Sequence, residues 1–157
     1  MREARTLGSW VIALFLVVML FWMAAELLAP QPPARNHLFE VFRDASDIAY
    51  FEPSGRFAFG VLGALAALLI LVPVTRRAGA ILSTLLLGVL AALVGQLVML
   101  GVTVPVDQIA EGGTVTTVAT DPSALFYLVA GLLAASLALV FVHPGSAGEK
   151  PEAGYAT

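Results

Sequence analysis

Three polar side chains within otherwise apolar stretches could carry chemistry: Glu26, Arg56 and Gln96. A carboxylate, a guanidinium and an amide can form an ion pair with an amide partner, and ionisable groups in a membrane are functional candidates by default. Each residue lies near one end of a long apolar segment, and we expect these ends to share one depth. We therefore treat Glu26, Arg56 and Gln96 as one candidate polar cluster. The structural alternative is that Glu26 reaches the lipid headgroups while Gln96 hydrogen-bonds a neighbouring backbone.

The composition indicates that these segments lie in a lipid bilayer. The 157 residues are 59% hydrophobic and 12% charged, whereas soluble domains are roughly half apolar and a quarter charged. The sequence has no cysteine, which excludes disulfides, thiol catalysis, cysteine-ligated Fe–S clusters and covalently attached haem. No basic patch indicates nucleic acid as a partner.

Four apolar segments are long enough to cross about 30 Å of hydrocarbon. We predict spans at about 7–29, 57–75, 78–104 and 123–142. A cleaved signal peptide is the alternative for the first segment, but its apolar core is too long and no small-residue cleavage site follows it. The prediction is an all-α integral membrane four-helix bundle. Residues 1–143 form its single transmembrane domain, and residues 144–157 form a disordered cytoplasmic tail.

The first two spans and the last two are joined by loops that have patterns of their own. In residues 37–51, apolar side chains recur at helical spacing opposite acidic ones, which predicts a short amphipathic helix in the interface plane. A helix packed over the mouth of the bundle is the alternative. Residues 102–106 and 114–118 are rich in β-branched side chains and flank a glycine pair, which predicts a small β-hairpin with Pro105 on an edge strand.

Small residues recur every four positions along the predicted third span. They are Ala80, Thr84, Gly88 and Ala92, followed by Gln96 at the same spacing. Such a stripe lets helices approach closely where no hydrophobic effect drives them together. We therefore predict that this face packs against a neighbouring helix.

The remaining polar side chains in the spans favour structural roles. Ser83, Thr84 and Ser136 are expected to hydrogen-bond carbonyl groups of their own helices. The two histidines, His37 and His143, flank opposite ends of the predicted bundle and cannot ligate one haem or metal together. We therefore expect no haem, Fe–S or metal site, and no sequence motif indicates a phosphate loop or a nucleophile paired with a base.

The distribution of basic residues predicts the topology. Arg2 and Arg5 precede the first span and an arginine pair at 76–77 follows the second, whereas residues 105–121 contain three acidic residues and no Lys or Arg. By the positive-inside rule, the N-terminus and the 76–77 turn face the cytoplasm. Four spans then place the C-terminus there too. Arg35, Arg43 and Arg56 in the first outer loop oppose this assignment, but acidic residues accompany them.

Three local patterns resemble the DoxX-like family of small bacterial four-helix membrane proteins. They are FWMAAEL at Phe21–Leu27, GVLGALAALLILVPVTRRAGA at Gly60–Ala80 and GQLVMLGV at Gly95–Val102. The chain departs from the family pattern at three positions, with Glu26 in place of a frequent Lys, Gly63 in place of a Glu and Gln96 in place of a His. The resemblance implies a bacterial inner-membrane protein, sometimes associated with sulfur or quinone oxidoreductase complexes.

We therefore expect a non-catalytic subunit or scaffold of a membrane-associated complex, with redox or quinone-linked chemistry in its partners. Its partners would be the lipid bilayer and either another protein or further copies of itself. One alternative is an oxidoreductase component that handles quinone near Glu26, Arg56 and Gln96. Another is a small permease, which would have to oligomerise because four spans with few interior polar groups offer a poor water path.

Overall fold

Four helices in the computed structural model are long and apolar enough to cross a membrane, as expected of a helical membrane protein. The structure describes residues 2–29, 37–110 and 113–142, with side chains from residue 7 onward. The long helices are α1 (Arg2–Leu28), α3 (Ser54–Leu71), α4 (Arg76–Leu100) and α5 (Ser123–Val142). The predicted tail at 144–157 lies outside the described residues.

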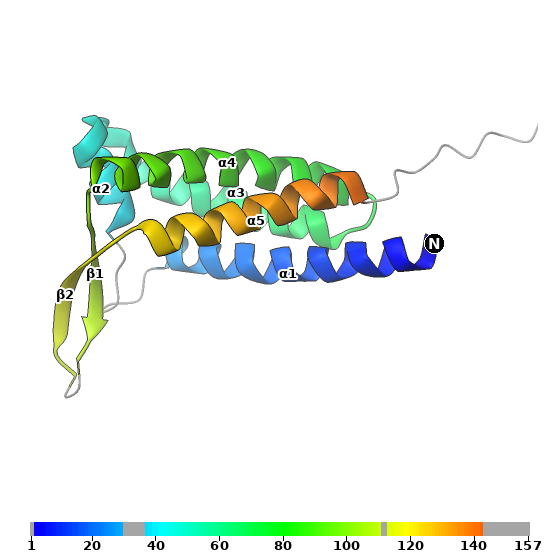
Figure 1. Ribbon diagram of the computed structural model, residues 1–157, viewed down its shortest axis with the longest axis horizontal. Coiled ribbons are helices and arrows are strands. Elements are labelled where there is room, and N and C mark those ends of the chain that lie inside the picture. Colours follow the sequence, from blue (N-terminus) through cyan, green and yellow to red (C-terminus); the bar gives the residue numbers. More distant parts are fainter. Residues whose placement is uncertain (1, 30–36, 111–112, 143–157) are drawn as a thin grey trace, which may run out of the picture.

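The four long helices lie side by side, with α1 and α4 each contacting both α3 and α5 (Figure 1). The N-terminal end of α1 and the turn Val72–Thr75 lie at one end of this array, which we call the turn end. The opposite end, which we call the hairpin end, carries the remaining elements. These are α2 (Leu38–Ser46), a 3₁₀ turn η1 (Ala49–Phe51), β1 (Val104–Ile109) and β2 (Val115–Thr120).

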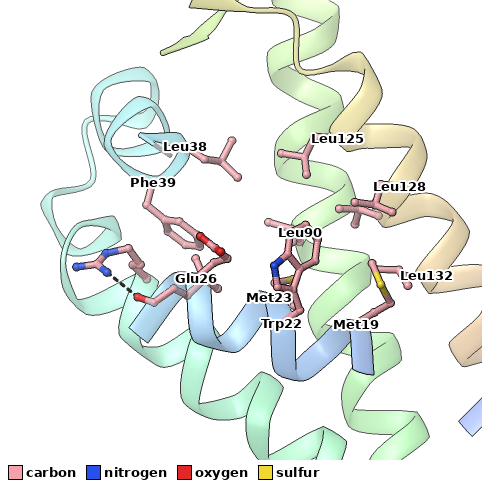
Figure 2. Close-up of a pocket in the computed structure, with 13 residues that line it drawn as sticks. Met19, Trp22, Met23, Glu26, Leu38, Phe39, Leu90, Leu125, Leu128 and Leu132 are labelled. Atoms are coloured by element: carbon pink, nitrogen blue, oxygen red, sulfur yellow. Dashed lines mark hydrogen bonds between the residues drawn. The ribbon is translucent and has the colours of Figure 1, made fainter. Parts of the chain in front are cut away.

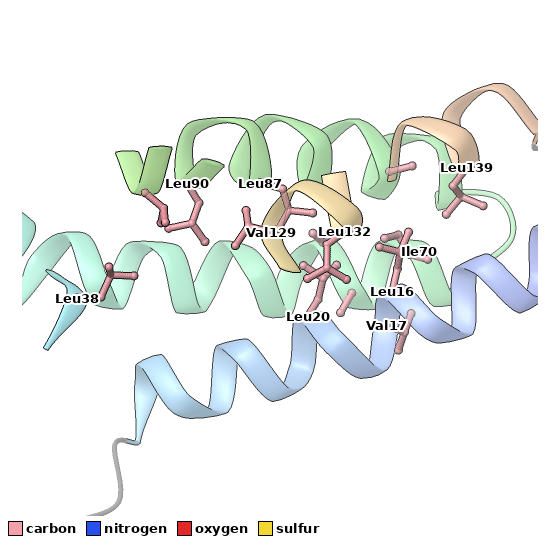
Figure 3. Packing of buried hydrophobic residues seen from close by; sticks show 14 of the residues in the cluster. Leu16, Val17, Leu20, Leu38, Ile70, Leu87, Leu90, Val129, Leu132 and Leu139 are labelled. Atoms are coloured by element: carbon pink, nitrogen blue, oxygen red, sulfur yellow. The ribbon is translucent and has the colours of Figure 1, made fainter. Parts of the chain in front are cut away.

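Buried leucine, isoleucine and valine side chains from all four long helices meet along the centre of the array (Figure 3). Leu16 and Leu20 of α1 and Leu87 of α4 have no exposed surface. The outer faces of the same helices remain apolar, with Val11, Leu65 and Leu85 among the exposed side chains. An apolar interior together with an apolar exterior is the pattern expected where lipid, rather than water, surrounds the helices.

Glycine allows the closest helix contact, at the turn end. A Cβ atom on Gly79 of α4 would lie 2.6 Å from the backbone nitrogen of Ile70 and 2.9 Å from the carbonyl oxygen of Ala66. Those atoms belong to the α3 backbone and cannot rotate away. The α3–α4 pair is therefore joined by direct backbone contact just beyond the turn.

The two strands form an antiparallel hairpin that projects from the hairpin end (Figure 1). The register pairs Val104 with Thr120 and Ile109 with Val115. The predicted hairpin is thus present. Three of its four strand ends lie one or two residues closer to the C-terminus than predicted, and the end of β1 lies three residues closer. Helix α2 buries Leu38, Phe39 and Phe42 against the rest of the protein.

Several predicted boundaries move because local geometry ends the helices early. The second span was expected to continue to residue 75, but α3 ends at Leu71 because Val72 is extended ahead of Pro73. The third was expected to continue to 104, but α4 ends at Leu100, where Gly101 adopts the left-handed conformation and caps the helix. The segment 37–51 divides at Asp47, which also has positive φ.

Candidate binding site

A mostly apolar pocket of about 280 Å³ lies between α1 and α5 in the half of the array nearer the hairpin end (Figure 2). Its floor includes Leu90 of α4 and the buried Val129 and Leu132 of α5. The other lining residues come from α1, α2, α3 and α5: Met19, Trp22, Met23, Glu26, Leu27, Leu38, Phe39, Arg56, Leu125 and Leu128. The volume is at the lower end of the roughly 300–1,000 Å³ typical of ligand pockets.

The pocket exists because α1 and α5 are the least tightly joined of the neighbouring long helices. Trp22 of α1 and Leu128 of α5 line it and are also 56% and 41% exposed. The pocket therefore opens sideways between these two helices, toward the surface that lipid would cover. The flexible side chains of Met19 and Met23 allow such a wall to adapt to different guests.

Helix α2 closes the end of the pocket with a cluster of aromatic rings. Phe39 packs edge-on against Phe42 and Phe59, at centroid distances of 5.7 and 5.6 Å. Phe42 in turn contacts Phe51 of η1 at 5.9 Å. These contacts fix α2 against α3 and hold Leu38 and Phe39 over the cavity.

Arg56 lies at the pocket and is held in place by Glu52 and by the end of α1. Its Nε donates to both carboxylate oxygens of Glu52, at 3.0 and 3.2 Å, and its Nη1 donates to the carbonyl oxygen of Leu27 at 2.5 Å. The guanidinium also lies 4.7 Å from the ring centroid of Phe57. Because only 13% of its side chain is exposed, Arg56 mainly connects the start of α3 to the end of α1.

Glu26 differs from Arg56 in that it is an exposed residue whose carboxylate has no hydrogen-bond or ion-pair partner among the described residues. Its side chain lines the same pocket (Figure 2). The structure thus brings two members of the candidate cluster, Glu26 and Arg56, to one cavity without pairing them. Gln96 is exposed on α4 and is not among the residues that line the pocket.

The small-residue stripe on α4 is buried toward the turn end and becomes exposed toward the hairpin end. Ala80 is fully buried and Thr84 is partly buried. Beyond them, a Cβ atom on Gly88 would meet nothing within 4 Å, and Ala92 is exposed. The expected packing against a neighbouring helix of the same chain is therefore seen only toward the turn end.

The buried hydroxyl groups join two helices at the turn end. Ser83 and Thr84 donate to the carbonyl oxygen of Ala80, at 3.0 and 2.8 Å, as expected within one helix. Ser136 was also expected to bond within its own helix, but it donates across to Ala80 at 2.9 Å and contacts both other hydroxyls. Ser136 can reach Ala80 because α5 packs directly on the small residues of α4.

The arginine pair divides between two environments. Arg77 is exposed, whereas Arg76 is only 2% exposed and donates from Nε to the carbonyl oxygen of Ile70 at 3.0 Å. The guanidinium of Arg76 lies 3.8 Å from the ring centroid of Trp10. A cation packed on an indole face is stabilised by the ring quadrupole, so Arg76 also fastens α1 to the turn.

A second polar group connects α2 to the hairpin. The side chain of His37 places Nδ1 2.6 Å from Glu40 and Nε2 3.1 Å from Asp107 of β1, and Asp107 accepts a 2.6 Å bond from Thr117 of β2. The hydrogen bond with Glu40 raises the pKa of His37 most, burial lowers it and Asp107 raises it further, leaving it above its ordinary value. At a pH close to the ordinary pKa of histidine, His37 therefore still carries its second proton and bridges two carboxylates.

At the start of α5, Asp121 is the residue that caps the helix. One of its carboxylate oxygens accepts bonds from the backbone nitrogen and hydroxyl of Ser123, at 2.8 and 2.7 Å. These bonds lower the pKa of Asp121.

Sequence reasoning did not identify the apolar walls of the pocket. Met19, Trp22 and Met23 read as ordinary residues of a membrane helix, and only their spacing of three and four places them on the face of Glu26. Comparison with family models, curated proteins and solved structures finds no match to this chain. The resemblance to the DoxX-like family therefore stays a prediction.

Proposed function

We propose that this protein is a non-catalytic integral membrane protein that binds a lipophilic molecule in the pocket between α1 and α5. The observation that carries the proposal is the pocket itself, an apolar cavity that opens sideways where lipid would surround the helices. A guest could enter from the bilayer without crossing water. Concave apolar sites with a few polar groups are the usual form of small-molecule sites.

The proposed setting is a four-helix bundle in the bacterial inner membrane, with α2 at headgroup level and the turn end in the cytoplasm. The exposed Arg77 at the turn end and the absence of Lys and Arg from β1 and β2 support this orientation. Because the sequence contains no cysteine, single cysteines at Arg77 and Thr116 can be labelled without background. A membrane-impermeant maleimide added outside intact spheroplasts should label Thr116→Cys and not Arg77→Cys. The reverse pattern would contradict the orientation.

Photolabelling tests the ligand proposal. Purified protein in neutral detergent is irradiated with decanol that carries a diazirine on its chain, and labelled peptides are identified by mass spectrometry. We expect labelling of α1 and α5 residues that line the pocket. Leu128→Trp should fill the opening of the pocket and abolish this labelling. Leu137→Trp should leave the labelling unchanged, because Leu137 lies on α5 outside the pocket and is as exposed as Leu128 (41% for both leucines). Uniform labelling that neither substitution changes would overturn the proposal.

A second function, that of a subunit or scaffold, is favoured by the open part of the α4 stripe. The unfilled space beside Gly88 and the exposed Ala92 would admit a helix from another protein or another copy at close range. An Ala92→Cys variant should form a disulfide-linked dimer in membranes if the second helix comes from another copy. A strictly monomeric Ala92→Cys, with no protein recovered by crosslinking from its native membranes, would contradict this role.

A further inference from the structure

The polar groups that line the pocket have unequal freedom to bind a guest. Arg56 already donates to Glu52 and Leu27, and its positive charge is matched by the Glu52 carboxylate. Glu26 has no such partner among the described residues. The charged group that remains available at the pocket is therefore an acceptor that carries a negative charge.

Two aromatic side chains line the same cavity as that carboxylate. Trp22 lies one helical turn before Glu26 on α1, and Phe39 reaches the cavity from α2 (Figure 2). Indole and phenyl faces attract cations, and rings that line a site for an ammonium group are a recurring means of recognition. A carboxylate next to such rings adds charge complementarity.

The remaining wall is made of leucine and methionine side chains, which would hold an apolar chain. The cavity of about 280 Å³ holds the head of a ligand, and its side opening lets a longer chain extend outward between α1 and α5. An anionic head group would meet the Glu26 charge without a free cation to offset it.

We propose that the pocket selects an ammonium group attached to an apolar chain, with Glu26 as the charged acceptor and Trp22 and Phe39 as the aromatic walls. This inference rests on the proposed ligand-binding function and specifies the head group. Two sources share this chemistry: a lipid with an aminoethyl head group and a free lipophilic amine.

The test compares three amphiphiles with the same tail: decylammonium, decanol and decanoate. Trp22 reports binding by fluorescence in a Trp10→Phe background, which leaves it as the single tryptophan of the chain. We expect saturable binding with the affinity order decylammonium, then decanol, then decanoate. Glu26→Gln should weaken decylammonium binding about ten-fold, because the loss of a partly exposed ion pair has an effect between those of an exposed and a buried pair. The same substitution should leave decanol binding unchanged. Glu26→Asp should keep the preference for the cation.

The outcomes separate the two proposals. Equal affinity for all three amphiphiles, or a cation preference that survives Glu26→Gln, would overturn the head-group inference while leaving the pocket as a lipophile site. Absence of saturable binding by any of them would contradict the ligand-binding function itself. In nanodiscs, competition by phosphatidylethanolamine but not phosphatidylglycerol would identify a lipid as the source of the ammonium group. Undiminished decylammonium binding in both lipids would instead support a free amine.

Discussion

The long helices pack closely at the turn end of this protein and leave a cavity at the hairpin end. At the turn end, Gly79 brings the α3 and α4 backbones into contact, and Ser136 connects α5 to α4 through Ala80. At the hairpin end, α1 and α5 leave a cavity between them that α2 closes. The difference shows that the same four helices pack closely at one end and leave a cavity at the other.

Polar side chains follow the same division. The buried Arg76 donates from Nε to Ile70 and packs on Trp10, and its buried Nη2 has no hydrogen-bond partner among the described residues, whereas the whole Glu26 carboxylate has none there. A polar group that is satisfied within the protein stabilises the fold. One that is left open near a cavity is available to bind.

The largest expected effect comes from filling the contact at Gly79. Gly79→Ala places a methyl group 2.6 Å from the Ile70 nitrogen, so the helices must separate, and we expect a loss of about 1–3 kcal/mol of unfolding free energy. Gly88→Ala is the matched control, because nothing lies within 4 Å of its added Cβ. Reversible unfolding in mixed micelles measures both. Equal stability of the two variants would contradict close packing at the turn end.

Removing the Arg76 guanidinium should have the next largest effect. Arg76→Leu loses the hydrogen bond to Ile70 and the contact with Trp10, which we expect to cost about 1–2 kcal/mol. Arg77→Leu, at the exposed neighbour, serves as the control. Single-tryptophan variants sharpen the comparison of the two ends, since Trp10 emission should change while Trp22 emission should not. A change at Trp22 alone would be inconsistent with the contact.

A smaller effect is expected at the hydroxyl cluster. Ser136→Ala removes the bond to Ala80 across the α4–α5 contact, and such bonds in membrane proteins contribute about 0.6 kcal/mol on average and up to about 1.7. Thr116→Ala on the exposed hairpin should leave stability unchanged. The same unfolding assay applies, and a Ser136→Ala variant as stable as the parent would show that the cluster adds nothing.

The smallest effect concerns pH at the hairpin end. The folded-state pKa of His37 is raised by Glu40 and Asp107, so its contribution is fully present below the ordinary pKa of about 6.5 and is lost as pH rises through the higher folded value. Hydrogen exchange in α2 should therefore quicken, beyond its intrinsic pH dependence, as pH rises from about 6 to above 8, and His37→Gln should remove this excess. An excess that persists in the variant would exclude His37 as its cause.

The sequence was sufficient for the parts of the fold that composition and turn residues determine. The existence of four long apolar helices and of a hairpin, and the α5 start at Ser123, follow from local patterns. Helix ends at Leu71 and Leu100 were missed because they depend on the conformations adopted at Val72 and Gly101. The stripe on α4 could not reveal that only its Ala80 end is buried.

The candidate site was predictable only in part, because helix rotation decides which side chains share a cavity. Depth alone grouped Glu26, Arg56 and Gln96, yet rotation of α4 leaves Gln96 outside the pocket. The pairing of Arg56 with Glu52, which precedes α3 and lies four residues before Arg56, was not anticipated. The leucine and methionine walls carry no sequence signal that separates them from lipid-facing positions.

Quenching of the two tryptophans tests the central claim most directly, since one lies at each end of the molecule. Trp22 lines the pocket, whereas Trp10 packs on Arg76 at the turn end. In neutral detergent, decanol brominated on its chain should quench Trp22 saturably in the Trp10→Phe variant. The same titration should quench Trp10 only weakly and without saturation in the Trp22→Phe variant. Equal, unsaturable quenching of both residues would show that the hairpin end holds no binding site.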